Sequence, residues 1–205
     1  MHIYFSIEFI ILLIMKNILI KYKFVFFVHF FLIFLGILGE KDKNYYGEYK
    51  THKYYKYLDE VGKKIMDSVD NSKKIMYIPK ENTPFCKSNS DYWGYVNFPH
   101  KKVSEFGICT YRIMKGSDYK NISFNLNSVI RHEAMHSAQF CRFPGLTALK
   151  PVGIELKYLM PYKKFVPNEG IYKDIPYDQK IGELEAYYGE DNPQLVLSKL
   201  NQLCY

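Results

Sequence analysis

Several features that would assign this 205-residue sequence to a common functional class are missing from it. The chain carries 28 lysines and arginines against 21 acidic residues, yet these cations are scattered and form no basic block that could follow a phosphate backbone. Its four cysteines include no Cys-x-x-Cys pair, so neither a zinc ribbon nor a thioredoxin-like redox centre is indicated. The formal net charge of +7 therefore predicts a lysine-rich solvated surface and no nucleic-acid partner.

A long apolar run occurs close to the first residue. Residues 24–38 are apolar except for His29 and Gly36, lysines precede them, and polar sequence follows from Glu40. This order is typical of a secretory signal. A spanning helix needs about 20 apolar residues, so the run is short for one, and a cleaved signal and a retained anchor both stay open. We expect a leader over 1–39, a domain over 40–205, and a protein that is exported or membrane-anchored.

All four cysteines follow this apolar run. They are Cys86, Cys109, Cys141 and Cys204. An even number in an oxidising compartment predicts two disulfides, and three pairings are open.

The periodicity of apolar residues predicts an α+β domain. Spacings of three and four residues, with capping residues at the ends, indicate helices. These are expected over 55–69, 128–141, 179–188 and 193–203. Aromatic and β-branched runs, or strict alternation, indicate strands. These are expected over 74–78, 92–98, 106–114 and 121–126. Residues 146–177 contain four prolines and are expected to be irregular. Strands followed by helices are typical of the α+β class, here with a small antiparallel or mixed sheet.

One motif carries chemistry. Residues 132–136 read His132-Glu133-Ala134-Met135-His136, the HExxH pattern. Residues four apart share one face of a helix, so both imidazoles can reach one Zn²⁺ ion. Glu133 would lie beside the metal and take a proton from an activated water. The strand expected over 121–126 would align an extended substrate by strand addition.

A catalytic zinc needs a third protein ligand. No histidine follows His136, and the earlier ones belong to the leader, to a Lys/Tyr-rich linker or, for His100, to an expected loop. The segment over 182–188 instead offers two carboxylates, Glu183 and Glu185, on the helix expected there.

An HExxH motif followed on a later helix by Glu-x-x-small resembles the gluzincin branch of the zincin metallopeptidases. In that branch the glutamate is the third ligand, and the small residue lets the two helices pack closely. Glu183 with Ala186 fits this spacing and is favoured on packing grounds, and Glu185 is the alternative. The resemblance covers residues 127–142 and 182–190, and it implies a minimal zincin-like fold.

The residue after the small one departs from the pattern of that branch. An Asp or Asn often stands there and orients a ligand histidine, whereas this chain has Tyr187. Glu190 or Asp191, one turn later, are the candidates for that role. An oxyanion-stabilising hydroxyl could come from Tyr187, Tyr188 or a tyrosine of residues 158–177.

Residues 107–109 and 136–142 also resemble small zincin-type processing peptidases of inner membranes, which carry cysteines near the HExxH helix. This likeness implies the disulfides Cys109–Cys141 and Cys86–Cys204.

The sequence thus predicts a zinc-dependent hydrolase, a metallopeptidase acting on a peptide or protein substrate, with membrane contact possible through the N-terminal run. The alternative is a binding or structural envelope domain in which zinc serves folding alone. A third reading is an envelope domain without a metal.

Overall fold

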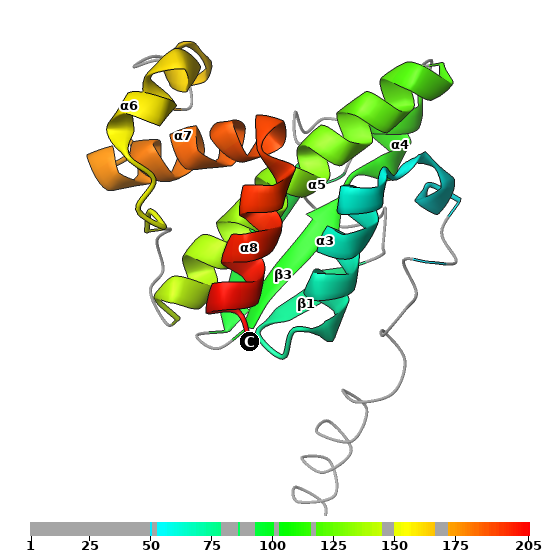
Figure 1. Ribbon diagram of the computed structural model, residues 1–205, viewed down its shortest axis with the longest axis horizontal. Coiled ribbons are helices and arrows are strands. Elements are labelled where there is room, and N and C mark those ends of the chain that lie inside the picture. Colours follow the sequence, from blue (N-terminus) through cyan, green and yellow to red (C-terminus); the bar gives the residue numbers. More distant parts are fainter. Residues whose placement is uncertain are drawn as a thin grey trace, which may run out of the picture. The chain divides into compact units, whose positions relative to one another are not determined.

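The longest described helix, α5 (Tyr119–Arg142), lies at the centre of the fold and contacts both strands and helices (Figure 1). The computed structural model describes residues 50, 53–78, 86, 93–100, 103–115, 118–144, 150–166 and 172–205. These residues all belong to one unit, residues 46–205. The leader expected over 1–39 lies outside the described residues.

Three strands form a mixed sheet. They are β1 (Ile75–Ile78), β2 (Gly94–His100) and β3 (Val103–Ile108), in the order β1-β3-β2. β1 runs parallel to β3, and β2 runs antiparallel to it, so β2 lies at an edge of the described sheet. The strands expected over 74–78 and 92–98 are confirmed with small shifts at their ends.

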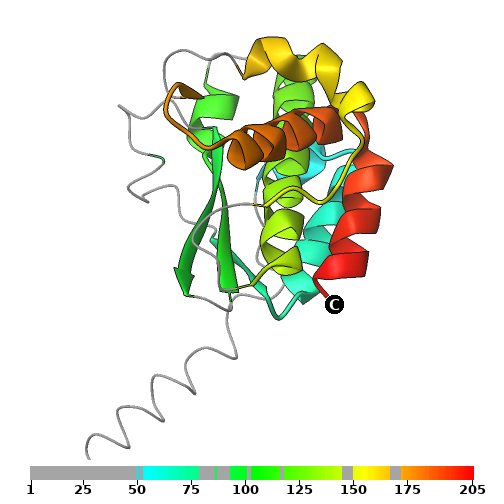
Figure 2. The ribbon, with the colours of Figure 1, turned by 90° about the vertical axis from the view of Figure 1, so that its left-hand side faces the viewer.

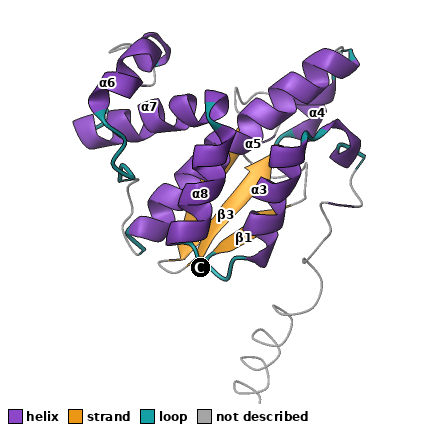
Figure 3. Cartoon of the chain, in the orientation of Figure 1, coloured by secondary structure: helices purple, strands orange, loops and turns teal. Residues whose placement is uncertain are grey.

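Helices pack on one face of this sheet in two layers (Figures 2 and 3). α5 covers β2 and β3, and the Phe140 ring stacks on Phe98 at 5.0 Å. α3 (Glu60–Asn71) covers β1, and it begins at Asp59, whose side chain accepts a hydrogen bond from the Gly62 amide. α8 (Pro193–Leu203) forms the outer layer against α3 and α5, with its Val196 and Leu200 fully buried.

The remaining helices lie around the two ends of α5. α7 (Tyr177–Asp191) packs across α5 and carries the short helix α6 (Leu156–Leu159) and the 3-10 helix η4 (Met160–Phe165). η2 (Tyr55–Tyr57) precedes α3, and α4 (Thr110–Met114) follows β3. The described chain is therefore α+β, as expected, and mostly helical.

The expected strand over 121–126 is wrong, because these residues form the beginning of α5. Asp118 caps this helix by accepting a hydrogen bond from the Asn121 amide at 2.8 Å. Ile122 and Leu126 are buried and four residues apart, whereas Phe124 is 73% exposed. The alternation of apolar residues was therefore compatible with a helix whose buried positions repeat every four residues.

The start of the HExxH helix and the end of the third strand also differ from expectation. Asn127, next to the expected start of the helix, lies within α5, and its side chain hydrogen-bonds the amide of Asp59 and the carbonyl of Tyr57. The expected strand over 106–114 ends at Ile108, and its second half is α4. The helix expected over 193–203 is confirmed with the same ends as α8. Those expected over 55–69, 128–141 and 179–188 are present with different ends, and the 128–141 helix is the second half of α5.

Two disulfides are present, but both implied pairings are wrong. The bonds join Cys86 to Cys109 and Cys141 to Cys204, each with a Cα–Cα distance of 5.1 Å. Cys109 donates its amide to the carbonyl of Trp93. The next residue, Gly94, packs against Glu133, two turns before Cys141, which is about 12 Å along the helix. Cys109 and Cys141 therefore lie too far apart to bond.

The disulfides are compatible with an extracytoplasmic protein. Within the part of the chain that the structure describes, no helix is both long enough and apolar enough to cross a membrane.

Candidate metal centre

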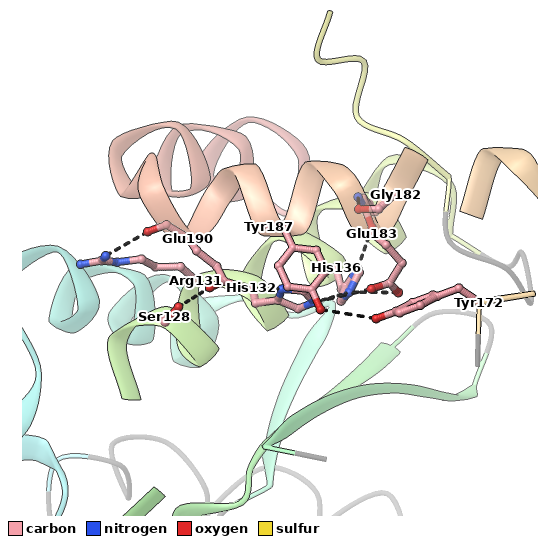
Figure 4. A network of polar contacts seen from close by, with 10 residues as sticks. Ser128, Arg131, His132, His136, Tyr172, Gly182, Glu183, Tyr187 and Glu190 are labelled. Carbon is pink, nitrogen blue, oxygen red and sulfur yellow. Dashed lines mark hydrogen bonds and ion pairs between the residues drawn. The ribbon is translucent and has the colours of Figure 1, made fainter. Parts of the chain in front are cut away.

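The two histidines of the HExxH motif lie one turn apart on the face of α5 that meets α7 (Figure 4). The Nε2 atoms of His132 and His136 are 3.2 Å apart, and their rings meet edge to face with centroids 4.8 Å apart. His136 is buried and His132 is partly buried.

α7 adds a carboxylate to this pair. Glu183 lies with Oε2 3.7 Å from His132 Nε2 and Oε1 3.5 Å from His136 Nε2. Its helix can approach α5 closely because Ala186 and Gly182 are small, and both are buried. The ligand atoms of His132, His136 and Glu183 all lie within 4.8 Å of one another, so this group could hold a metal ion.

The alternative ligand, Glu185, points away from the histidines. Its side chain is fully buried and accepts hydrogen bonds from the backbone amides of Val152, Gly153 and Ile154 at 2.6–2.8 Å. Glu185 therefore clamps the chain that leads into α6. The geometry places Glu183, and not Glu185, beside the two imidazoles.

A carboxylate two turns after Glu183 on α7 orients His132. Glu190 Oε1 lies 2.8 Å from His132 Nδ1, and Ser128 donates its hydroxyl to the other oxygen of Glu190. Arg131 donates to the Glu190 carbonyl at 3.0 Å. Of the two residues expected for this role, Asp191 instead accepts a hydrogen bond from Tyr162 at 2.8 Å.

An amide side chain orients His136. Gln139 Oε1 lies 2.8 Å from His136 Nδ1, and its nitrogen donates to the Gly182 carbonyl at 2.8 Å and to Glu185. Since that nitrogen is held by two acceptors, the oxygen faces the ring, and His136 Nδ1 must carry the proton.

The same reasoning applies to His132, whose Nδ1 faces a carboxylate. Both neutral imidazoles then have a bare lone pair on Nε2, and these lone pairs converge with the Glu183 oxygens. Three acceptors around one point repel one another unless a cation lies between them. Tetrahedral zinc would hold two nitrogens about 3.3 Å apart, close to the 3.2 Å observed between the Nε2 atoms. The residues present therefore fit a bound divalent metal.

The pKa values of the metal-free site agree with this arrangement of acceptors around one point. Burial would raise the pKa of Glu183, but His136 and His132 outweigh it and lower that pKa to about 2. Burial would lower the pKa of His132, but hydrogen bonds with Glu183 and Glu190 hold it well above 6.5. Burial lowers the pKa of His136. The acceptors of the site therefore attract a positive charge, which in the metal-free protein is a proton on His132.

The glutamate of the motif, Glu133, is buried where α5 packs against the edge strand β2. A Cβ added at Gly94 of β2 would lie 2.7 Å from Glu133 Cγ, so the strand backbone rests directly on this side chain. Burial raises the pKa of Glu133 to about 7, with Glu183 and Glu190 acting in the same direction against His132. A carboxyl group that titrates near neutral pH can both accept and donate a proton.

Two of the tyrosines expected as oxyanion donors lie beside the site. The Tyr187 ring meets the His132 ring edge to face at 4.7 Å, and its hydroxyl is 3.4 Å from that of Tyr172. Burial, and then the hydrogen bond with Tyr187, raise the pKa of Tyr172, so its hydroxyl stays protonated. Tyr188 instead lies against Tyr158 and Tyr162, away from the histidines.

Sequence reasoning missed the residues that hold the ligands in place. Gln139 follows His136 by three residues, a spacing that brings two side chains together on a helix, and this was the available signal. Ser128, where the HExxH helix was expected to begin, bonds Glu190. Nothing in the sequence links Ser128 to a residue 62 positions later. His100, the other histidine considered, is the last residue of β2.

Comparison with known proteins gives one match. The family model for a domain of unknown function, DUF8637, matches residues 54–205. No curated protein and no solved structure matches the chain. The match covers most of the sequence, including His132, Glu133, His136 and Glu183. The chain therefore belongs to the DUF8637 family, and residues 54–205 are its family domain.

Proposed function

We propose that this protein is a zinc-dependent hydrolase, a metallopeptidase in which His132, His136 and Glu183 hold Zn²⁺ and Glu133 is the general base. The convergence of two Nε2 lone pairs and one carboxylate on a single point supports this proposal most directly. Two imidazoles and one carboxylate are a donor set that suits zinc in catalytic sites, where a fourth position is left for water or substrate.

Three observations favour catalysis over a zinc that serves folding alone. Among the described residues, three could act as ligands, whereas structural zinc sites usually have four. The Glu183 side chain is 22% exposed, so the site can be reached from solvent. The buried carboxyl group of Glu133 directly follows the ligand His132, and a purely structural site would have no use for it there.

When bound, zinc would lower the pKa of a water molecule in its open position and polarise a substrate carbonyl. Glu133 would take a proton from that water and deliver it to the leaving amine. Gln139 and Glu190 would keep both Nδ1 protons in place, so that the Nε2 lone pairs stay aimed at the metal. In this proposal the protonated hydroxyl of Tyr172 would donate a hydrogen bond to the developing oxyanion.

The substrate would be an extended peptide, bound along the edge strand. β2 presents an edge of the described sheet, and its Gly94 touches Glu133. A strand added to this edge would bring its backbone next to the general base. In this proposal β2, and not residues 121–126, is the strand that would align the substrate.

The test combines metal content with hydrolysis. The purified chain should contain one zinc by native mass spectrometry, and His136→Ala should lose both zinc and activity. Glu133→Gln should keep its zinc while the hydrolysis of a quenched fluorescent peptide library falls by about 10²–10⁴-fold.

The possible outcomes distinguish a hydrolase from a zinc-stabilised domain and from a domain without a metal. Full activity in Glu133→Gln would refute the general base. Bound zinc without hydrolysis of any peptide in the library would favour the binding or structural domain. A chain that folds equally well and binds no zinc would refute the metal centre.

A further inference from the structure

The segment formed by α6 and η4 exposes an unusual share of the large apolar side chains of the described chain. Ten such side chains are exposed among the described residues, and four of them lie in this ten-residue segment. They are Leu156 (51%), Tyr158 (47%), Met160 (58%) and Phe165 (46%). Leu156 and Met160 are four residues apart and lie along one side of a helical turn.

The same segment is held firmly on its other side. Leu159 is fully buried and packs with Val166 and with Leu184 of α7 in a small apolar cluster. The exposed apolar residues therefore belong to an ordered, two-sided segment. Figures 1 and 2 both place it at the rim of the described chain, beyond α7.

Lysines lie between these apolar residues in the sequence. Lys157, Lys163 and Lys164 are all exposed, and the only acidic residue between 155 and 166 is Glu155, which pairs with Lys157 at 2.7 Å. Three lysines against one glutamate leave a charge of +2 on residues 155–166. The ammonium groups of Lys157 and Lys164 lie over the Tyr158 and Phe165 rings at 4.8 and 4.9 Å.

We infer that the α6–η4 segment is a membrane-docking surface that inserts Leu156, Tyr158, Met160 and Phe165 into the interface of an anionic lipid bilayer. A short helical segment that exposes apolar and aromatic side chains with lysines beside them can lie at the boundary between headgroups and acyl chains. Lysine stems pack along the apolar region while their charges reach the headgroups, and an anionic surface attracts them.

The rest of the sequence agrees with a membrane as the partner. The apolar run over 24–38, read as an export signal or anchor, would bring this chain to or across a membrane during its biosynthesis. An acidic protein partner would be attracted by the lysines, but its acidic groups would not account for the four exposed apolar side chains.

The proposed docking surface lies close to the metal centre. Phe165 stacks on Tyr187 with ring centroids 5.1 Å apart, and Tyr187 in turn meets His132. The proposed surface thus ends one aromatic ring away from a ligand of the candidate metal site. The inference does not rest on the proposed hydrolase activity, because lipid binding needs neither the metal nor a substrate.

The full chain can be tested with a fluorescent reporter at one position, which separates this segment from any membrane contact of the N-terminal run. The chain has a single tryptophan, Trp93, so Trp93→Phe provides a silent background. In it, Met160→Trp reports on the segment, and Phe124→Trp, at a site on α5 that is also exposed, is the control. Vesicles of phosphatidylcholine and phosphatidylglycerol (3:1) are compared with vesicles of phosphatidylcholine alone, with and without brominated acyl chains.

On the anionic vesicles, emission from position 160 should shift to the blue and be quenched by brominated lipid, whereas position 124 should show neither effect. Lys163→Glu with Lys164→Glu should raise the lipid concentration needed for this shift by about tenfold or more, since each lysine near an anionic surface strengthens binding about fivefold. Lys64→Glu with Lys73→Glu, which changes the net charge equally, should have a much smaller effect.

Three results would overturn the inference. Emission from position 160 could stay unshifted and unquenched on both vesicles, which would exclude insertion. It could respond equally on phosphatidylcholine alone, which would exclude recognition of anionic lipid. It could shift without vesicles as the protein concentration rises, which would assign the surface to contact between two copies of the chain.

Discussion

Glu190 offers the sharpest test of how the site is built. Its carboxylate accepts the Nδ1 proton of His132 at 2.8 Å, and the substitution Glu190→Gln keeps the shape of the side chain while removing its charge. Carboxylates in this position typically contribute 10–100-fold to metal affinity, or about 1.4–2.7 kcal/mol. The amide oxygen can still accept the proton, so we expect a loss near the lower end, about tenfold.

The neighbouring residue supplies a matched control. Asp191→Asn removes the same charge one position later, but Asp191 contacts Tyr162 and not a histidine. Zinc affinity, measured by competition with a chromophoric chelator at fixed pH, should fall in Glu190→Gln and stay unchanged in Asp191→Asn. Equal losses in both variants would mean that only the overall negative charge matters, and no loss in either would refute the orienting role of Glu190.

The pH dependence adds a readout that a merely structural role would not change. Zinc binds the neutral imidazole, so a proton on His132 competes with it. Hydrogen bonds with Glu183 and Glu190 outweigh burial and hold the pKa of His132 well above 6.5 in the metal-free protein, so zinc affinity should rise with pH through and above this value. Glu190→Gln should lower the pKa of His132, so that protons compete less with zinc for this imidazole in the variant. The difference in affinity between wild type and variant should therefore narrow as the pH falls, and a constant difference would contradict this account.

Two further predictions concern the scaffold. Gly94→Ala would place a methyl group 2.7 Å from Glu133 Cγ; it should cost about 1–3 kcal/mol of stability and lower hydrolysis by about 10²-fold without loss of zinc. In Gly107→Ala the added methyl group would lie 2.2 Å from a tyrosine ring on the other face of the sheet, so this control should lower stability without lowering hydrolysis. Equal losses of activity in the two variants would contradict the contact between Gly94 and Glu133. Replacing Cys141 and Cys204 by serine should lower the free energy of unfolding, measured with urea, by about 4 kcal/mol, because the bond closes a loop of 63 residues. A loss below about 1 kcal/mol would show that packing alone holds α8 in place.

Local spacing in the sequence predicted the core of the candidate site. The four-residue spacing of His132 and His136 fixes both imidazoles on one face of a helix wherever that helix lies. Asn192-Pro193 likewise predicted the start of α8, because proline is favoured in the first turn of a helix. Such features depend on neighbours within one or two turns, which the sequence shows directly.

Predictions failed where a short pattern fits two structures. Ile122, Phe124 and Leu126 alternate like a strand, yet Ile122 and Leu126 are also one helical turn apart. What selects the helix is burial of those two residues against the core, together with the cap at Asp118, and Phe124 is left in solvent. Periodicity over six residues could not show which partner surface the segment would meet.

The sequence by itself determined the HExxH face, the candidate carboxylates on a later helix and the presence of two disulfides. Only the tertiary structure decided that Glu183 faces the histidines while Glu185 is turned into the chain before α6. It also selected Glu190 over Asp191 and paired Cys141 with Cys204. The reason is physical: spacing along one helix sets the relative directions of its own side chains, whereas the crossing of α5 and α7 depends on how small residues such as Ala186 let two distant segments pack.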